Sequence, residues 1–260
     1  MTAAVLLASI VVMRTLSRSR SKDRVLARFY TVGSASAPSG VKLLHFVRHA
    51  EGTHNVEKKY LSPDNFDAPL TAVGVEQCRK LAAQTRAMHI DLIVSSPLTR
   101  TLQTACLGFE AAVGAGTPVV AEESVRETVN YLCDARRNVS QLRKEFDVVD
   151  FSRIRSEEDP LWAKYEKQYG SQSDFTGHRE SDDLASLAAR ARLALNFLAS
   201  RTESSIAVVS HNAFLTHLFN TDLGGVVEFG DDAARDLLTR PWANSELRTV
   251  AVVISSTSAL

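Results

Sequence analysis

The chain has 260 residues, and its 30 basic side chains balance its 30 acidic side chains. Hydrophobic residues make up 45% of the sequence and charged residues 23%, which excludes a wholly disordered chain. Residues 1–40 hold six basic side chains and one acidic side chain, so residues 41–260 carry a net negative charge. This distribution excludes a globally basic nucleic-acid-binding protein, and no nucleic-acid partner is expected.

The first 40 residues differ from the rest. The apolar run Ala3–Met13 is shorter than the roughly 20 residues of a membrane span, so no stable span is expected. Residues 14–28 are rich in Arg and Ser, as in mitochondrial transit peptides, and residues 28–31 resemble a matrix-processing site. Residues 31–40 read as a linker. We expect a targeting or disordered segment and linker over 1–40, a globular domain over 41–260, and a mitochondrial location. A disordered tail, a short membrane anchor and a cytoplasmic protein are the alternatives.

The first part of the body alternates between strand and helix patterns. Leu43–Val47 is apolar enough for a buried strand. A helix is predicted over Thr71–Met88, with Thr71 as its N-cap. Leu92–Val94 is the next strand, and Pro97 is placed at the first turn of the helix that follows. Pro118–Ala121 is a short third strand. The first two strands are each followed by a helix, as is typical of parallel sheets.

The second part contains a long irregular stretch. Residues 122–180 are dense in charge, which is typical of a lid or pocket wall. Ser181 is predicted to cap a long helix, and strands are predicted over Ile206–Val209 and Leu247–Ile254. The alternation predicts an α/β fold: a mainly parallel central sheet with helices on both faces, a three-layer sandwich.

Two predicted strands end directly before a histidine. His49 follows the strand that ends at Val47, and His211 follows the strand that ends at Val209. Arg100 lies near the start of the helix after the second strand. Each residue alone has an ordinary structural explanation, a hydrogen-bonded histidine or a solvated arginine. Because ligands bind beyond the carboxyl ends of parallel strands, their convergence points to a phosphoryl site.

Four segments in order resemble the histidine phosphatase superfamily, also called phosphoglycerate mutase-like proteins. Residues 48–55, Arg-His-Ala-Glu-Gly-Thr-His-Asn, are similar to its R-H-G-x-x-x-x-N signature. Residues 69–74 match P-L-T-x-x-G, residues 95–105 match S-S-P-L-x-R-x-x-Q-T-A, and residues 208–212 match the segment of the second histidine. The resemblance covers residues 42–220 and implies a phosphoglycerate mutase-like sandwich. Ala at position 50 departs from Gly, which costs little unless φ is positive there.

The resemblance implies a role for each matching residue. His49 is the nucleophile that becomes phosphohistidine. The phosphoryl oxygens are held by Arg48, Asn55, Arg100 and His211. The general acid and base corresponds to Glu127, for which a surface salt bridge with Arg126 or Arg136 is the alternative. His54 is expected to be an exposed loop residue, although it is a further candidate for the pocket.

Hydrolysis of a small phosphorylated metabolite is the main functional hypothesis. Residues 126–137 lack the R-H-Y-G-like run of cofactor-dependent mutases, which disfavours a mutase. Phosphoglycerate mutase-type transfer and a non-catalytic protein that binds phosphorylated ligands remain alternatives. No cofactor or metal is expected, because histidine and arginine supply what Mg²⁺ otherwise does. Most charged residues of the middle segment are expected to be solvated: Arg136, Arg137, Arg153, Arg155, His178 and Arg179. The substrate and the oligomeric state are left open.

Overall fold

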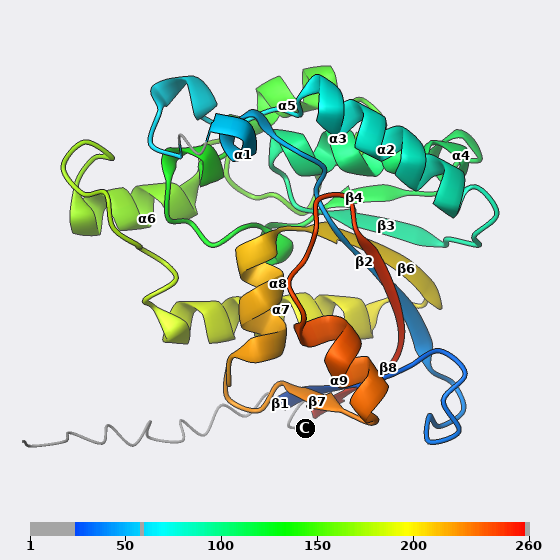
Figure 1. Cartoon of the computed structure of the whole chain (residues 1–260). Helices are drawn as coiled ribbons and strands as arrows, with labels where there is room; N and C mark the ends of the chain where they lie inside the picture. The colour runs from blue at the N-terminus through cyan, green and yellow to red at the C-terminus, as the bar shows by residue number, and fades with distance from the viewer. Residues whose placement is uncertain (1–23, 58–59, 258–260) are drawn as a thin grey trace, which may run out of the picture.

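A computed structural model describes residues 24–57 and 60–257 as an α/β sandwich (Figure 1). The sheet order is β5-β4-β3-β6-β2-β8-β1-β7, and β8 pairs antiparallel with both of its neighbours whereas every other pair is parallel. The strands of this described part are β1 (Arg24–Tyr30), β2 (Lys42–Arg48), β3 (Leu92–Ser95), β4 (Val119–Ala121), β5 (Val149–Asp150), β6 (Ser205–Ser210), β7 (Val227–Phe229) and β8 (Leu247–Thr257). The predicted fold class is therefore confirmed.

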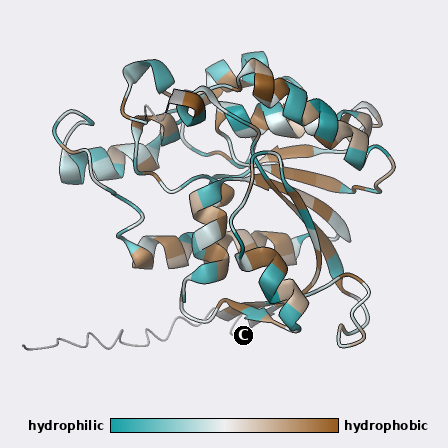
Figure 2. Ribbon diagram, viewed as in Figure 1, coloured by the Kyte–Doolittle hydropathy of each residue, from teal (hydrophilic) through white to brown (hydrophobic). Residues whose placement is uncertain are grey.

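Helices cover both faces of the sheet and enclose two hydrophobic cores (Figure 1). One face carries α2 (Ala72–Thr85), α3 (Thr99–Gly108), α4 (Glu110–Gly114) and α5 (Val139–Glu145). The other face carries α7 (Leu184–Ser200), α8 (Asn212–Asn220) and α9 (Asp232–Thr239). The shorter or peripheral elements are α1 (Thr53–Glu57), η1 (Pro63–Asn65), η2 (Glu123–Val125), η3 (Leu132–Asp134) and α6 (Pro160–Tyr169). Figure 2 shows the sheet as the most hydrophobic layer, because it is buried on both sides.

Side chains that cap the helices fix where they begin. The predicted N-cap of α2 is confirmed, since the hydroxyl of Thr71 accepts a hydrogen bond from the backbone N–H of Gly74 at 3.0 Å. The prediction for α7 was wrong by two residues. Its N-cap is Asp183, whose carboxylate accepts from the N–H of Ser186 at 3.0 Å, whereas the hydroxyl of Ser181 binds a side-chain amide. Ser181 and Asp183 lie in the same short polar run, and both residue types are favourable N-caps, so the sequence alone did not distinguish between them.

The expected start of the domain at residue 41 is wrong, because β1 belongs to the sheet. β1 pairs with β8 along its whole length and with β7 on its other side. Phe29 is fully buried, and its ring lies 6.2 Å from that of Phe46 and 5.4 Å from that of Phe219. Cleavage at residues 28–31 would therefore cut through a core strand.

The remaining N-terminal interpretation, a targeting segment before Arg24, lies outside the described residues. Across residues 24–57 and 60–257, no helix combines the length and the apolar character that crossing a membrane requires.

Truncating Phe29 tests whether β1 is part of the core. We expect Phe29→Ala to lower the free energy of unfolding by about 3–5 kcal/mol, because a fully buried ring leaves a cavity. Val32→Ala, two residues beyond the strand at a 50% exposed position, should change it by less than about 0.5 kcal/mol. Urea denaturation of both variants measures the difference, and equal stabilities would contradict this placement of β1.

Candidate active site

The predicted histidines meet at the carboxyl ends of β2 and β6. In the parallel pairing of these strands Arg48 lies opposite Ser210, and the backbone N–H of His49 donates to the carbonyl of Ser210 at 2.9 Å. The residue that follows each strand is a histidine, so His49 and His211 lie at the same edge of the sheet. The ring centroids of His49 and His211 are 5.0 Å apart. The convergence expected from the strand pattern is present.

His49 is held in one tautomer. Its Nδ1 lies 2.7 Å from the carbonyl oxygen of Ala50, which can only accept, so Nδ1 carries the hydrogen and Nε2 bears the lone pair. Burial lowers the pKa of His49 well below the ordinary histidine value, and the nearby charges of Arg100 and Arg48 lower it further. His49 is therefore a neutral imidazole with a free nucleophilic nitrogen.

Both predicted arginines are anchored through their terminal nitrogens. Arg48 donates from Nη1 to the carbonyl of Trp242 at 2.6 Å. Arg100 donates from Nη1 to the carbonyl of Cys133 at 2.6 Å and from Nη2 to the carboxylate of Asp134 at 3.1 Å. The Nε atoms of both arginines are buried and have no hydrogen-bond partner among the described residues. Buried donors left unpaired in this way suit an anion.

His211 is the second buried imidazole of the site. Its Nε2 lies 2.8 Å from the hydroxyl of Ser96, which follows β3, and its Nδ1 is buried with no partner within the described part of the chain. Burial lowers the pKa of His211 well below the ordinary value, and Arg100 adds to the effect. Ser96 thus orients a neutral His211 beside His49. Ser96 belongs to the motif at residues 95–105, but the sequence did not indicate this role for it.

Glu127 belongs to the site and forms no salt bridge with any residue in the described part of the chain. Its carboxylate accepts from the backbone N–H groups of Ala213 at 3.2 Å and Phe214 at 2.8 Å, in the first turn of α8. Arg126 and Arg136, the partners that the alternative required, pair with other carboxylates. The N-terminus of a helix favours a carboxylate at this position. The helix that follows His211 therefore also fixes Glu127.

The loop after β2 turns inward around Asn55. The side-chain oxygen of Asn55 accepts from the N–H of Gly52 at 3.0 Å, and its amide donates to Nε2 of His54 at 3.1 Å. His54 is only 4% exposed, so its prediction as an exposed loop residue was wrong. Because Nε2 accepts, Nδ1 of His54 carries the hydrogen, and that atom is buried without a partner among the described residues. His54 is a third neutral imidazole of the site.

The start of α2 braces this loop, which explains the P-L-T-x-x-G segment. The backbone N–H of Thr71 donates to the carbonyl of Glu51 at 2.9 Å, and its hydroxyl donates to the carboxylate of the same residue at 2.7 Å. A side chain at Gly74 would approach the carbonyl oxygen of Glu51 to 2.2 Å. Ala50 does not have a positive φ, so alanine replaces glycine there without backbone strain.

Gly74 provides a test of the brace. We expect Gly74→Ala to lower the free energy of unfolding by about 1–3 kcal/mol and to reduce activity, because the added methyl group displaces the loop that carries His49. Gly114→Ala is the matched control, since open space surrounds that helical glycine, and it should be neutral or stabilise by up to about 1 kcal/mol. Thermal denaturation with activity assays checks both, and two indistinguishable variants would contradict the brace.

A cavity of about 470 Å³ is lined by Arg48, His49, His54, Asn55 and Glu127, whereas Arg100 and His211 are buried and absent from its lining. Its walls come from the loop after β2, from residues 127–134, from residues 178–182 and from the start of α8. Of the middle-segment charges singled out from the sequence, only His178 lines it. Asn212 belongs to the segment of the second histidine, but no role in the site was predicted for it. The other wall residues that the sequence did not indicate lie outside the motifs: Tyr60, Thr128, Asn130, Tyr131, Cys133, Asp134, Ser181, Asp182, Ala213 and His217. No group of three or more metal-binding side chains occurs in residues 24–57 and 60–257.

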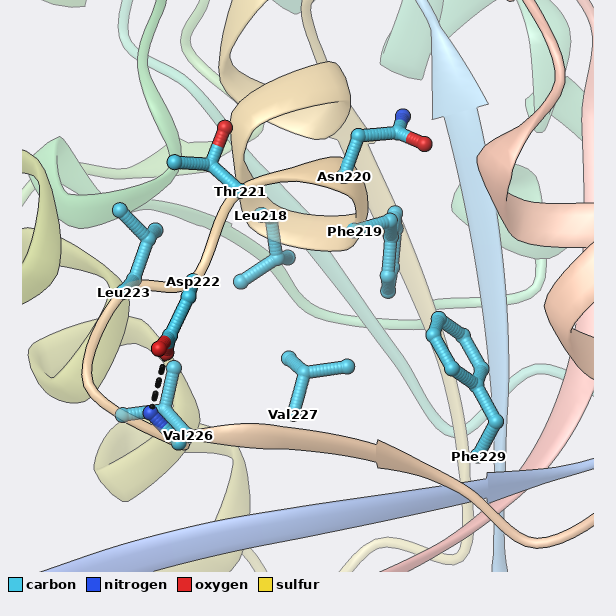
Figure 3. A pocket seen from close by; sticks show the side chains of 10 residues that line it. Leu218, Phe219, Asn220, Thr221, Asp222, Leu223, Val226, Val227 and Phe229 are labelled. Atoms are coloured by element: carbon cyan, nitrogen blue, oxygen red, sulfur yellow. Dashed lines mark hydrogen bonds between the residues drawn. The ribbon is translucent and has the colours of Figure 1, made fainter.

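A second hollow of about 250 Å³ lies between the end of α8 and β7 (Figure 3). Leu218, Val226 and Phe229 face the space, and the polar residues Asn220, Thr221 and Asp222 also line it. Asp222 accepts a hydrogen bond from the N–H of Gly225 at 2.9 Å and so shapes the turn. None of the residues predicted for the phosphoryl site lines this hollow.

The order of the motifs and this geometry define the class of protein. The chain belongs to the histidine phosphatase superfamily (branch 1), whose family model matches residues 44–236. Phosphoglycerate mutase-like protein 1 of Arabidopsis thaliana is 36% identical over 247 residues, covering 82% of this chain and 81% of that protein. A probable phosphatase of Schizosaccharomyces pombe is 27% identical over 173 residues, covering 65% and 74%. The alpha-ribazole phosphatase structure from Shigella flexneri aligns with a TM-score of 0.49 and 19% identity, covering 80% of this chain and 89% of that one.

The buried histidines predict acid sensitivity. His49, His54 and His211 have lowered pKa values in the folded protein, so below about pH 6.5 the unfolded chain takes up protons that the folded chain does not. We expect stability to fall between about pH 7.5 and about pH 5.5, by up to ~1.4 kcal/mol per pH unit for each histidine. Urea denaturation without phosphate in the buffer measures this slope. His54→Gln should reduce it by about one proton, and an unchanged slope would count against the neutral imidazole.

Proposed function

We propose that the chain is a phosphomonoester hydrolase that acts through a phosphohistidine on a small phosphorylated metabolite. One observation carries the proposal: Nε2 of neutral His49 has no hydrogen-bond partner among the described residues, and Arg48 and Arg100, each with a buried unpaired Nε, are close enough for their charges to act on the same imidazole. A protein that only binds phosphate needs the donors but not a nucleophile in a fixed tautomer. The combination suits phosphoryl transfer.

The first step transfers the phosphoryl group to His49. The lone pair on Nε2 forms a bond to phosphorus as the bond between phosphorus and the ester oxygen breaks. The arginines and Nδ1–H of His211 stabilise the charge on the phosphoryl oxygens. Glu127 takes up a proton as the phosphoryl dianion binds beside it and gives that proton to the leaving oxygen, so an alcohol departs. The Nδ1–H bond to Ala50 persists and stabilises the positive charge on the imidazole.

The second step returns the site to its starting state. Glu127, now a carboxylate, takes a proton from water, whose oxygen attacks phosphorus as the bond to Nε2 breaks. His49 regains its lone pair, inorganic phosphate leaves, and Glu127 is protonated again. A phosphomonoester and water thus give an alcohol and phosphate, with no other reactant.

Phosphate release from phosphomonoesters tests the proposal. We expect His49→Ala to lower kcat at least about 10³-fold and Glu127→Gln about 10²–10⁴-fold, because each removes a group that acts on the reacting atoms. His89→Ala, whose side chain is 86% exposed and far from the cavity lining, is the control and should keep full activity. Full activity of His49→Ala would overturn the mechanism.

Two further measurements separate the alternatives. Labelled phosphate should be trapped on His49 after an alkaline quench, which a purely binding protein would not show. Activity that depends on an added bisphosphate primer would indicate a mutase, the activity to which the names of the Arabidopsis relatives refer. We expect turnover without a primer.

A further inference from the structure

Beyond the phosphoryl position, the charge on the described cavity wall is acidic. This wall holds one arginine and three carboxylates: Arg48, Glu127, Asp134 and Asp182. Arg100 is 1% exposed, is absent from the lining of the cavity and pairs with Asp134. No lysine or second arginine of the described residues lines the remaining space; Lys58 and Lys59 lie outside them. The phosphoryl group therefore occupies the described cations, Arg48 and Arg100, and no described cation that lines the cavity is left for a second anionic group.

A leaving group with its own negative charge would meet carboxylates. Asp182 is exposed in the turn before α7 and lines the cavity beside His178. Asp134 is buried against Arg100, so its charge is already used. A carboxylate or second phosphate in the cavity would thus lie near like charges without a described cation to offset them. A neutral or positively charged leaving group would not meet this repulsion.

Aromatic rings form a continuous row through the same cavity. The ring centroids of successive members are 5.6 Å apart for His49 and His54, 6.0 Å for His54 and Tyr60, 5.5 Å for Tyr60 and Tyr131, and 5.9 Å for Tyr131 and His178. Exposure rises along the row from buried His54, through the half-buried tyrosines, to exposed His178. The row therefore leads from the nucleophile to the exposed end of the cavity at His178. Aromatic side chains along it favour contact with an aromatic or other ring of a ligand.

We propose that the substrate is a monophosphate ester whose leaving group carries a ring and no negative charge. This inference rests on the proposed hydrolase function and specifies its substrate class: phosphorylated phenols or ring-bearing alcohols, neutral or cationic. Phosphoglycerates and bisphosphates, with their second anionic group, do not fit. Tyr131 and Asp182 set this preference, through ring contact and through charge.

Matched pairs of ligands test the charge preference. Phenyl phosphate and 4-carboxyphenyl phosphate differ in one carboxylate, as do glycerol 3-phosphate and 3-phosphoglycerate. We expect kcat/KM to favour the neutral member of each pair by about tenfold or more. The non-hydrolysable pair benzylphosphonate and 4-carboxybenzylphosphonate should show the same order of Kd by calorimetry. Equal or better use of the carboxylate members would overturn the inference.

Reversing the charge at the mouth tests Asp182. Asp182→Lys should shift the ratio toward the carboxylate member by about tenfold. Asp236→Lys makes the same charge change at an exposed position on α9, outside the cavity lining, and should leave the ratio unchanged. If both variants shift the ratio equally, or neither does, the preference does not come from Asp182 and its assigned role fails.

The ring contact has its own test in Tyr131→Leu. We expect kcat/KM for phenyl phosphate to fall about fivefold or more, while that for glycerol 3-phosphate falls less than about twofold. Equal losses would contradict stacking. The phosphonate affinities keep the two proposals apart: an inert protein that still prefers the neutral phosphonate loses the hydrolase proposal alone, whereas an active protein that prefers the carboxylate members loses this inference alone.

Discussion

The register of β2 against β6 is the constraint on which the site depends. Arg48 lies opposite Ser210, so the histidine after each strand leaves the sheet at the same edge. Along each of these strands, successive side chains enter opposite hydrophobic cores. Phe46 and Val208 pack in one core, and Val47 and Val209 pack in the other. Because a slip by one residue would turn every side chain to the wrong face, burial on both sides holds the histidines together.

The site concentrates positive charge in a place where water is excluded. Three imidazoles remain neutral beside two guanidinium groups, and Asp134 offsets part of the charge on Arg100. Burying an ion pair is costly unless its hydrogen bonds are complete, and here the guanidinium Nε atoms lack partners among the described residues. In the proposed function, a phosphoryl dianion would complete them. The negative body of the chain offers no long-range attraction for such a ligand, so recognition is local.

The sequence predicted the structure best for strands that are buried on both faces and for motifs whose residues are close together in the chain. The apolar runs of β2, β3 and β6 and the caps near them predict the sheet edge and the residues at it. β1 was missed because its arginines resemble a targeting peptide, although Val25, Ala27 and Phe29 alternate as a strand should. β7 has three residues, too few for a pattern. His54 was a candidate for the pocket, but the local sequence did not indicate its burial. Asp134 was not predictable, because its hydrogen bond to Arg100, 34 residues away in sequence, brings it into the site.

The first and last strands of the described sheet lie next to each other. β1 pairs with β8 at every residue from Arg24, opposite Thr257, to Tyr30, opposite Ala251. β8 also separates β1 from β2, so the early strands cannot join one sheet until the last strand arrives. The contacts between them span more than 200 residues of sequence, which makes their formation slow. In a chain emerging from the ribosome, the sheet therefore forms only after β8 has left the exit tunnel, and until then the edges of β1 and β2 that pair with β8 are both exposed.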